Sequence, residues 1–133
     1  MVSLLIANAK NDGLRLTPIR IKIFELFSTA SEPLSEADLQ KSIAANKSTI
    51  YRELNTLLTK NYIAEVDFAD GVKRYELSSL NHHHHLICVK CKSVQDVTLE
   101  ENLSGEEERI FKQKKFQVAK HALEFFGYCN NCQ

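Results

Sequence analysis

The stretch that decides the fold of the N-terminal half is NKSTIYRELNTLLTKNYIAEVDFADGVKRYEL, residues 46–77. Its first part predicts a helix that starts near Asn46, because apolar residues recur there every three or four positions. The apolar stripe of this helix comprises Ile50, Leu54, Leu57 and Leu58. The second part predicts a β-hairpin, because two β-type runs, 62–69 and 72–77, are joined by Asp70-Gly71, a dipeptide that favours a tight turn. The stretch therefore predicts a helix followed directly by a two-stranded wing.

Further helices are predicted before this stretch. Thr17 is placed to cap a helix that begins at Pro18 and runs to about residue 29, since proline suits the first helical position. Ser35 followed by Asp38 resembles a capping box, with aspartate in place of the usual glutamate or glutamine. A short helix is also expected over residues 3–12. The three helices that start at Pro18, after Ser35 and near Asn46, followed by a hairpin, give the order of a winged helix-turn-helix, so we predict a winged-helix DNA-binding domain over residues 1–79.

The second half, residues 80–133, contains every cysteine and histidine of the chain. Short β-type runs predict strands over 86–88 and 94–99. The segment 100–115 predicts a helix, because its acidic residues precede its lysines and so complement the helix dipole. Residues 116–126 predict a last strand. We therefore expect an α+β protein whose second part is a small α/β domain that needs a staple or a partner for stability.

The most specific pattern in the chain is a pair of CxxC motifs, Cys88-x2-Cys91 and Cys129-x2-Cys132. Four thiolates in this arrangement can surround Zn²⁺ tetrahedrally at about 2.3 Å. The alternatives are disulfides and thioredoxin-like redox pairs, but neither motif opens a helix after a strand. The motifs therefore predict a structural zinc site that ties the C-terminus back to the strand region.

Four consecutive histidines, His82 to His85, precede the first CxxC motif. Because side chains alternate along a strand, His83 and His85 would face one way and His82 and His84 the other. One segment could then supply ligands to two separate metal sites; the alternative is a solvated polar loop. Further candidate ligands are Glu76, Asp96 and His121, although their spacing alone also suits ordinary surface residues.

The start of the helix in the stretch 46–77 carries side chains that suit DNA contact. Tyr51 and Arg52 can reach phosphates and base edges, as can the hydroxyls before them, and Lys47 can pair with a phosphate. Arg15, before the Thr17 cap, can enter a minor groove. The alternative is an amphipathic helix with a polar outer face. The predicted DNA-binding residues are Arg15, Lys47, Ser48, Thr49, Tyr51 and Arg52.

Composition narrows the class of protein further. The chain has 17 basic and 17 acidic residues, so any basic surface must be local. No apolar run is long enough to span a membrane, and the first residues lack the basic leader of a signal peptide. We expect a cytoplasmic protein. The cytoplasm is a reducing compartment, in which cysteines bind metal more often than they form disulfides. No hydrolase motif is present, so we expect no enzyme.

Taken in order, these motifs resemble the ferric uptake regulator family of bacterial metal sensors. The resemblance runs from about residue 14 to the end, and its most specific blocks are Ser48-Thr49-Ile50-Tyr51-Arg52 and the histidine run with Cys88-x2-Cys91. It implies a homodimer that binds a palindromic AT-rich operator in double-stranded DNA, with structural Zn²⁺ on the four cysteines. It also implies a regulatory metal site of Glu76, His83, His85 and Asp96, and a second site that includes His82, His84 and His121.

The chain departs from the family pattern at two places. Many members supply a histidine from the DNA-binding domain to the regulatory site, but this position is Pro33 here, next to Glu32. The usual glutamate of the second site falls at Ser104 by spacing, so we predict the nearby Glu101 as its oxygen ligand. The effector is expected to be Zn²⁺ or Fe²⁺, with Mn²⁺ possible, and the histidine run favours the zinc uptake regulator branch.

The resulting functional prediction is a metal-dependent repressor of metal uptake or homeostasis genes. The first alternative is a peroxide sensor that works through metal-catalysed oxidation of a histidine ligand. The second is a zinc-ribbon module for protein interaction without DNA binding, which would leave residues 17–77 unexplained.

Overall fold

The computed structural model describes residues 2–100 and 103–133 and divides into two compact units, Met1–Leu80 and Asn81–Gln133. The division lies one residue after the domain boundary predicted from the sequence. Within the described residues, no helix is both long and apolar enough to cross a membrane.

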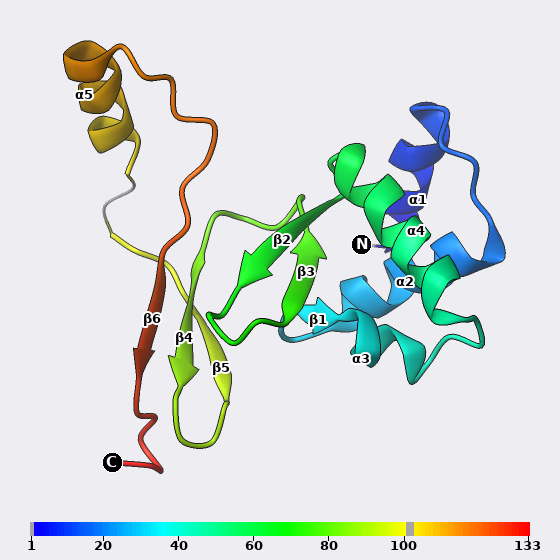
Figure 1. Cartoon of the computed structure of the whole chain (residues 1–133). Coiled ribbons are helices and arrows are strands. Elements are labelled where there is room, and N and C mark those ends of the chain that lie inside the picture. The colour runs from blue at the N-terminus through cyan, green and yellow to red at the C-terminus, as the bar shows by residue number, and fades with distance from the viewer. Residues whose placement is uncertain (1, 101–102) are drawn as a thin grey trace. The chain divides into compact units, whose positions relative to one another are not determined.

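The first unit combines helices with a small antiparallel sheet (Figure 1). The helices are α1 (Val2–Asn11), α2 (Pro18–Thr29), α3 (Glu36–Gln40) and α4 (Lys47–Thr59). The strands are β1 (Leu34–Ser35), β2 (Ile63–Asp67) and β3 (Lys73–Leu77). Strand β3 lies between the other two, in the order β1-β3-β2. The helices and the β2–β3 wing match the sequence prediction, whereas the two-residue strand β1 was not predicted.

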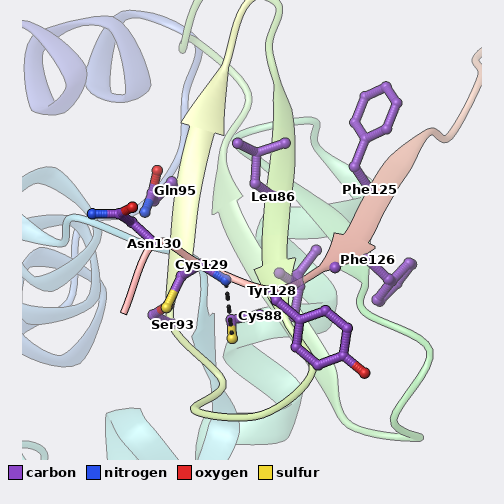
Figure 2. A pocket seen from close by; sticks show the side chains of 11 residues that line it. Leu86, Cys88, Ser93, Gln95, Phe125, Phe126, Tyr128, Cys129 and Asn130 are labelled. Atoms are coloured by element: carbon purple, nitrogen blue, oxygen red, sulfur yellow. Dashed lines mark hydrogen bonds between the residues drawn. The ribbon is translucent and has the colours of Figure 1, made fainter. Parts of the chain in front are cut away.

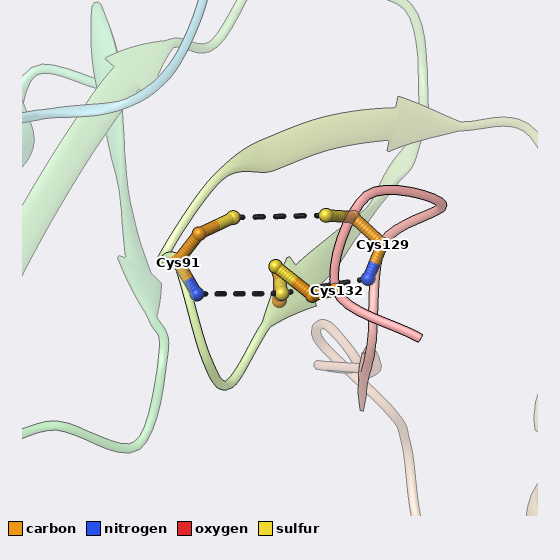
Figure 3. A group of neighbouring side chains, drawn as sticks. Cys91, Cys129 and Cys132 are labelled. Atoms are coloured by element: carbon orange, nitrogen blue, oxygen red, sulfur yellow. Dashed lines mark hydrogen bonds between the residues drawn. The ribbon is translucent and has the colours of Figure 1, made fainter.

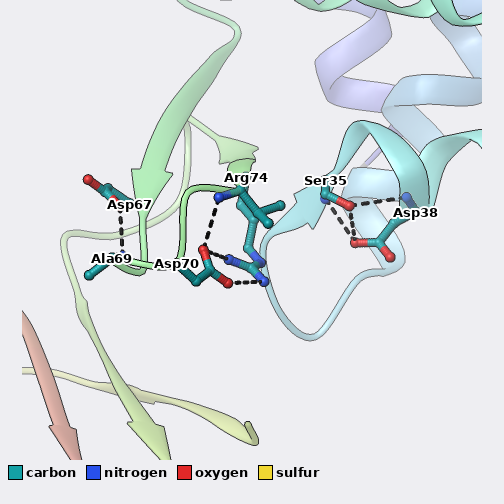
Figure 4. Close-up of polar contacts among 7 residues, drawn as sticks. Ser35, Asp38, Asp67, Ala69, Asp70 and Arg74 are labelled. Atoms are coloured by element: carbon teal, nitrogen blue, oxygen red, sulfur yellow. Dashed lines mark hydrogen bonds and ion pairs between the residues drawn. The ribbon is translucent and has the colours of Figure 1, made fainter. Parts of the chain in front are cut away.

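Local hydrogen bonds explain where these helices begin. The Thr17 side chain accepts from the Arg20 backbone N–H at 3.2 Å, and the Asn46 side chain accepts from the Thr49 N–H at 2.8 Å. Ser35 and Asp38 form a reciprocal capping box, drawn in Figure 4. Each cap satisfies backbone donors that the first helical turn leaves unpaired.

The wing is closed by a polar turn. In Figure 4, Asp67 accepts a hydrogen bond from the backbone N–H of Ala69, and Asp70 pairs with Arg74 at 2.9 Å. Gly71 has a φ of 76°, a conformation that favours glycine, so the chain does turn at Asp70-Gly71. The predicted strands were too long, however: β2 ends at Asp67 and β3 starts at Lys73, so the loop spans residues 68–72 and not two residues alone.

The hydrophobic core of the first unit joins its helices to the sheet. Its most completely buried large side chains include Ile23, Phe24, Leu39, Ile50, Leu54, Leu57 and Ile63. Three of these form the predicted stripe of α4, whose fourth member, Leu58, is partly buried. Burial of each such side chain contributes about 1.5–3 kcal/mol to the stability of the fold, so these contacts hold α4 against the core. The opposite face of α4 is exposed.

The second unit is a three-stranded sheet with one helix. It contains β4 (His84–Cys88), β5 (Val94–Val97), α5 (Ser104–Lys114) and β6 (Glu124–Gly127). Strand β4 is central, antiparallel to β5 and parallel to β6. Three predicted ranges were too long: the strand 94–99 ends at Val97, the helix 100–115 starts at Ser104, and the strand 116–126 is confined to β6.

Candidate metal and DNA sites

The four cysteines lie together in the second unit (Figure 3). Cys88 ends β4 and is buried, Cys91 lies in the turn before β5, and Cys129 and Cys132 lie in the C-terminal turn after β6. The sulfur atoms of Cys91 and Cys129 are 3.7 Å apart. This separation is too long for a disulfide, whose S–S bond is about 2.05 Å. It agrees with the spacing of about 3.8 Å that tetrahedral Zn–S bonds of about 2.3 Å impose.

Backbone amides prepare this cluster to hold charge. The N–H groups of Cys129 and Cys91 point at the Cys88 sulfur, at 3.4 and 3.5 Å, and lower the pKa of the Cys88 thiol to about 6. In contrast, the neighbouring sulfur of Cys129 raises the pKa of Cys132 to about 12. Because four crowded thiols resist joint ionisation, the cluster suits a divalent cation that compensates the thiolate charges.

The histidine run divides into two alternating pairs, as predicted, although only His84 and His85 belong to β4 and His82 and His83 directly precede it. On one face, the Nε2 atom of His82 lies 3.2 Å from the Nε2 atoms of both His84 and His121. We call these residues the three-histidine cluster. The Nδ1 atom of His84 faces the carbonyl oxygen of Leu123 at 2.8 Å, which leaves the three Nε2 atoms to converge. Such convergence of imidazole nitrogens is the donor chemistry of a first-row metal site.

A carboxylate that the sequence did not single out borders the three-histidine cluster. Glu107, in the first turn of α5, lies 2.7 Å from Nδ1 of His121. The predicted oxygen ligand, Glu101, lies outside the described residues. Glu107 belongs to the glutamate-rich segment noticed in the sequence, but spacing along the chain gave no means of selecting it.

The opposite face of β4 carries the other two histidines. The ring centroids of His83 and His85 are 4.8 Å apart. Asp96 is the antiparallel partner of His85, and its Oδ1 lies 3.8 Å from the His85 Nε2 atom. The His85 ring is almost fully buried and also contacts Glu124 of β6, which the sequence reasoning missed. Glu76, the fourth predicted regulatory ligand, belongs to the first unit, where it is half-buried on β3 opposite Ala64.

The predicted DNA-contacting side chains lie at the start of α4. Lys47, Ser48, Tyr51 and Arg52 are exposed, and Thr49 is half-buried. Tyr51 is 50% exposed even though it is aromatic. The hydroxyl of Thr49 accepts a 3.4 Å hydrogen bond from Arg52. A single helix end therefore presents two cationic side chains, hydroxyls and an aromatic ring to solvent.

Arg15 is exposed, and its backbone is tied to α4 through Arg20. The Arg20 guanidinium donates to the Arg15 carbonyl oxygen at 2.8 Å and to the Glu53 carboxylate at 2.5 Å. The side chains of Arg20 and Glu53 are mostly buried, at 16% and 18% exposed. This link fixes the segment before α2 relative to the helix that carries Tyr51 and Arg52.

The second unit exposes large apolar side chains around a hollow (Figure 2). Leu86 of β4 lies beside its register partner Phe125 of β6, and both border a hollow together with Phe126 and Tyr128. The four side chains are between 38% and 63% exposed. Strand β6 is also an edge strand of its sheet. Exposed apolar side chains gathered around a hollow are typical of an interaction surface.

Comparison with known proteins agrees with this architecture. The Helicobacter pylori ferric uptake regulator, whose structure is described as having three functional metal binding sites, has the same fold. It aligns with a TM-score of 0.78 over 99% of this chain and 93% of its own, at 22% sequence identity. A zinc-bound manganese uptake regulator aligns with a TM-score of 0.69, covering 94% of this chain and 98% of its own at 28% identity.

Sequence comparison identifies the family. The Neisseria meningitidis serogroup A ferric uptake regulation protein is 34% identical over 134 residues, covering 96% of this chain and 92% of that protein. The profile of the ferric uptake regulator family matches residues 11–126. Members of this family are transcriptional regulators and not enzymes. The chain belongs to the ferric uptake regulator family.

Proposed function

We propose that this protein is a homodimeric, metal-responsive repressor that controls genes of metal uptake or homeostasis. The supporting observation is the division of four consecutive histidines between the two faces of β4, with a carboxylate beside a ring on each face. Imidazoles and carboxylates held close together suit first-row divalent metals. Regulators of this family bind DNA and act as dimers.

We assign structural Zn²⁺ to the four cysteines. All four sulfur atoms lie within 4.8 Å of one another, and two backbone amides face Cys88. A structural zinc site is closed, with four protein ligands and no open position, which excludes a catalytic role for this ion. Its contribution is to the folding of the second unit.

We assign the regulatory metal to Glu76, His83, His85 and Asp96. The histidines and Asp96 belong to the second unit, and Glu76 belongs to the first. A divalent cation supplies a positive centre that ligands from both units can share. A cation bound by side chains of both units stabilises the arrangement of the units in which those side chains meet. In a dimer, this arrangement sets the separation of the two α4 helices, which must match half-sites about one helical turn apart.

A second site is proposed at the three-histidine cluster, with Glu107 in place of Glu101 as the adjacent carboxylate. The Glu107 carboxylate faces Nδ1 of His121, so the Nε2 atom of His121 remains directed at the other two rings. A site with three nitrogen donors favours zinc over manganese or iron in affinity.

The DNA-binding surface is proposed to be the start of α4 together with Arg15. Tyr51 and Arg52 are placed to reach base edges in the major groove, and Lys47, Ser48 and Thr49 to contact phosphates. Arg20 bonds both the Arg15 carbonyl oxygen and Glu53 of α4, and so holds the Arg15 backbone relative to this helix. This placement suits entry of the Arg15 side chain into the adjacent minor groove of an AT-rich operator. The exposed apolar face around Leu86 and Phe125 is proposed to bury itself against a second copy of the chain.

The effector metal is Zn²⁺ or Fe²⁺ in this proposal, with Mn²⁺ third. Proteins similar to this chain are named for different metals: ferric uptake in Neisseria meningitidis, and manganese uptake in a structure that contains zinc. Mixed imidazole and carboxylate ligands accept all three ions, so affinity order alone does not select the effector.

Titration of an AT-rich palindromic DNA duplex with the dimer, under anaerobic conditions, tests the function. The protein is first treated with a chelator weak enough to leave zinc on the cysteines, and its metal content is measured. Adding the effector is expected to raise DNA affinity roughly 10²–10⁴-fold, because coupling of about 1–3 kcal/mol per site acts at two sites per dimer. Parallel titrations with Zn²⁺, Fe²⁺ and Mn²⁺ identify the effector.

The control is a non-palindromic duplex of equal length and composition, whose weaker binding should respond little to metal. Equal operator affinity with and without each of the three metals, for a zinc-stapled dimer, would refute the proposed function.

A further inference from the structure

Strand β6 places a carboxylate against a histidine of the regulatory set. Glu124 is the register partner of His85 across the parallel β4–β6 pair. Its Oε2 atom accepts the backbone N–H of His85 at 2.8 Å and lies 3.0 Å from Nδ1 of the same residue. The Glu124 side chain is 14% exposed and the His85 side chain 2%. One mostly buried oxygen therefore holds both the backbone and the ring of His85.

This geometry determines which ring nitrogen carries the proton. An ionised carboxylate only accepts hydrogen bonds, so the Nδ1 atom that faces it must be the donor in a neutral ring. The lone pair of His85 then lies on Nε2, the nitrogen directed toward Asp96 at 3.8 Å. Because metals bind the unprotonated nitrogen, the Glu124 contact presents His85 in the tautomer that suits the regulatory ligand set.

Leu123, the residue directly before β6, provides an internal comparison. The carbonyl oxygen of Leu123 holds Nδ1 of His84, at 2.8 Å, in the three-histidine cluster. Two successive residues of one chain segment thus orient one ring on each face of β4, the first with a neutral carbonyl and the second with a carboxylate. A charged acceptor makes the opposite ring nitrogen a stronger base than a neutral acceptor does. The carboxylate therefore strengthens Nε2 of His85 as a metal ligand more than the carbonyl strengthens Nε2 of His84.

We propose that Glu124 is a positioning residue of the regulatory site: it fixes the tautomer and orientation of His85 and strengthens its Nε2 atom as a metal ligand. This inference rests on the proposed function for its biological meaning, but the contact itself lies wholly within the second unit. It adds a residue from outside the predicted ligand set, and it ties the regulatory site to the strand that also carries Phe125.

Two variants test the proposal. Glu124→Ala removes the acceptor, and Glu124→Gln keeps the shape and one carbonyl oxygen but removes the charge. We expect metal affinity at the regulatory site, measured by competition with a chelator, to fall about 100-fold for Glu124→Ala and about 10-fold for Glu124→Gln. Glu108→Ala is the matched control, since it removes an exposed carboxylate of α5 that pairs with Lys112 and should leave the regulatory site unchanged.

A second readout separates positioning from general destabilisation. Two-bond ¹⁵N–¹H correlation spectra at pH 8, with zinc kept on the cysteines and no other metal, report which nitrogen of His85 is protonated. The protonated atom should be Nδ1 in the unaltered protein and in Glu124→Gln, and Glu124→Ala should give a mixture of tautomers.

Unchanged metal affinity in Glu124→Gln, or a His85 ring already protonated on Nε2 in the unaltered protein, would overturn the proposal. The tautomer measurement needs neither DNA nor the effector, so it stays decisive even where the repressor function fails its own test.

Discussion

Replacing Cys88 with serine is expected to unfold the second unit while the first unit stays folded. Among the described residues of the second unit, the buried apolar side chains are Ile87 and Cys88 alone, whereas the first unit has a core of thirteen buried residues. A three-stranded sheet with so little buried apolar surface cannot offset its conformational entropy. A structural zinc site contributes about 10–16 kcal/mol of metal-binding free energy at neutral pH, enough to decide whether the unit folds.

Zinc stoichiometry and amide-resolved NMR spectra would check this expectation. Cys88→Ser should lose the zinc and the dispersed resonances of residues 81–133, and keep those of the first unit. Ser93→Ala is the matched control, because Ser93 lies 3.2 Å from the Cys91 sulfur without belonging to the four thiols. A Cys88→Ser protein that remained fully folded without zinc would show that packing, and not the metal, holds the second unit together.

A triple variant, Glu76→Ala with His83→Ala and His85→Ala, is expected to lose metal-dependent DNA binding while remaining folded and dimeric. The four cysteines and the exposed apolar face are untouched, so folding and association should persist. Without the shared ligands, the effector no longer favours one arrangement of the two units, and the roughly 10²–10⁴-fold gain in operator affinity disappears. The comparison is made by operator titration with and without the effector.

Two single substitutions serve as controls for the triple variant. Glu65→Ala removes an exposed carboxylate from the strand next to Glu76, and His82→Ala removes the histidine adjacent to His83 that belongs to the other cluster. Both should retain the metal response of the regulatory site. If the triple variant responded to metal like the unaltered protein, the assignment of the regulatory ligands would be wrong.

Local signals account for what the sequence predicted well. The starts of α2, α3 and α4 were predicted because Thr17, Ser35 and Asn46 cap helices through bonds only three residues long. The turn at Asp70-Gly71 was predicted for the same reason. Alternation along the extended segment that leads into β4 also predicted which histidines lie together, since side-chain direction in extended backbone depends on position.

Features that depend on distant partners were not predictable. The two residues of β1 are a strand only because β3 lies beside them, and residues 116–123 are not a strand although their composition allowed one. Glu124 is 39 residues from His85, and it stood in the sequence as a lone acid between Leu123 and Phe125. Glu107 was one glutamate among several. Pairing of β4 with β6 selected Glu124 and the contact of α5 with His121 selected Glu107, and one sequence carries no signal of either contact.

The decisive measurement is an anomalous-diffraction structure of the dimer loaded with its effector and recorded at the absorption edge of that metal. The expected density peak lies between a Glu76 carboxylate oxygen and imidazole nitrogens of His83 and His85, at bond lengths of about 2.0–2.2 Å. A fully loaded crystal in which Glu76 bound no ion and stood apart from both histidines would contradict a switch that works by sharing one cation between the two units.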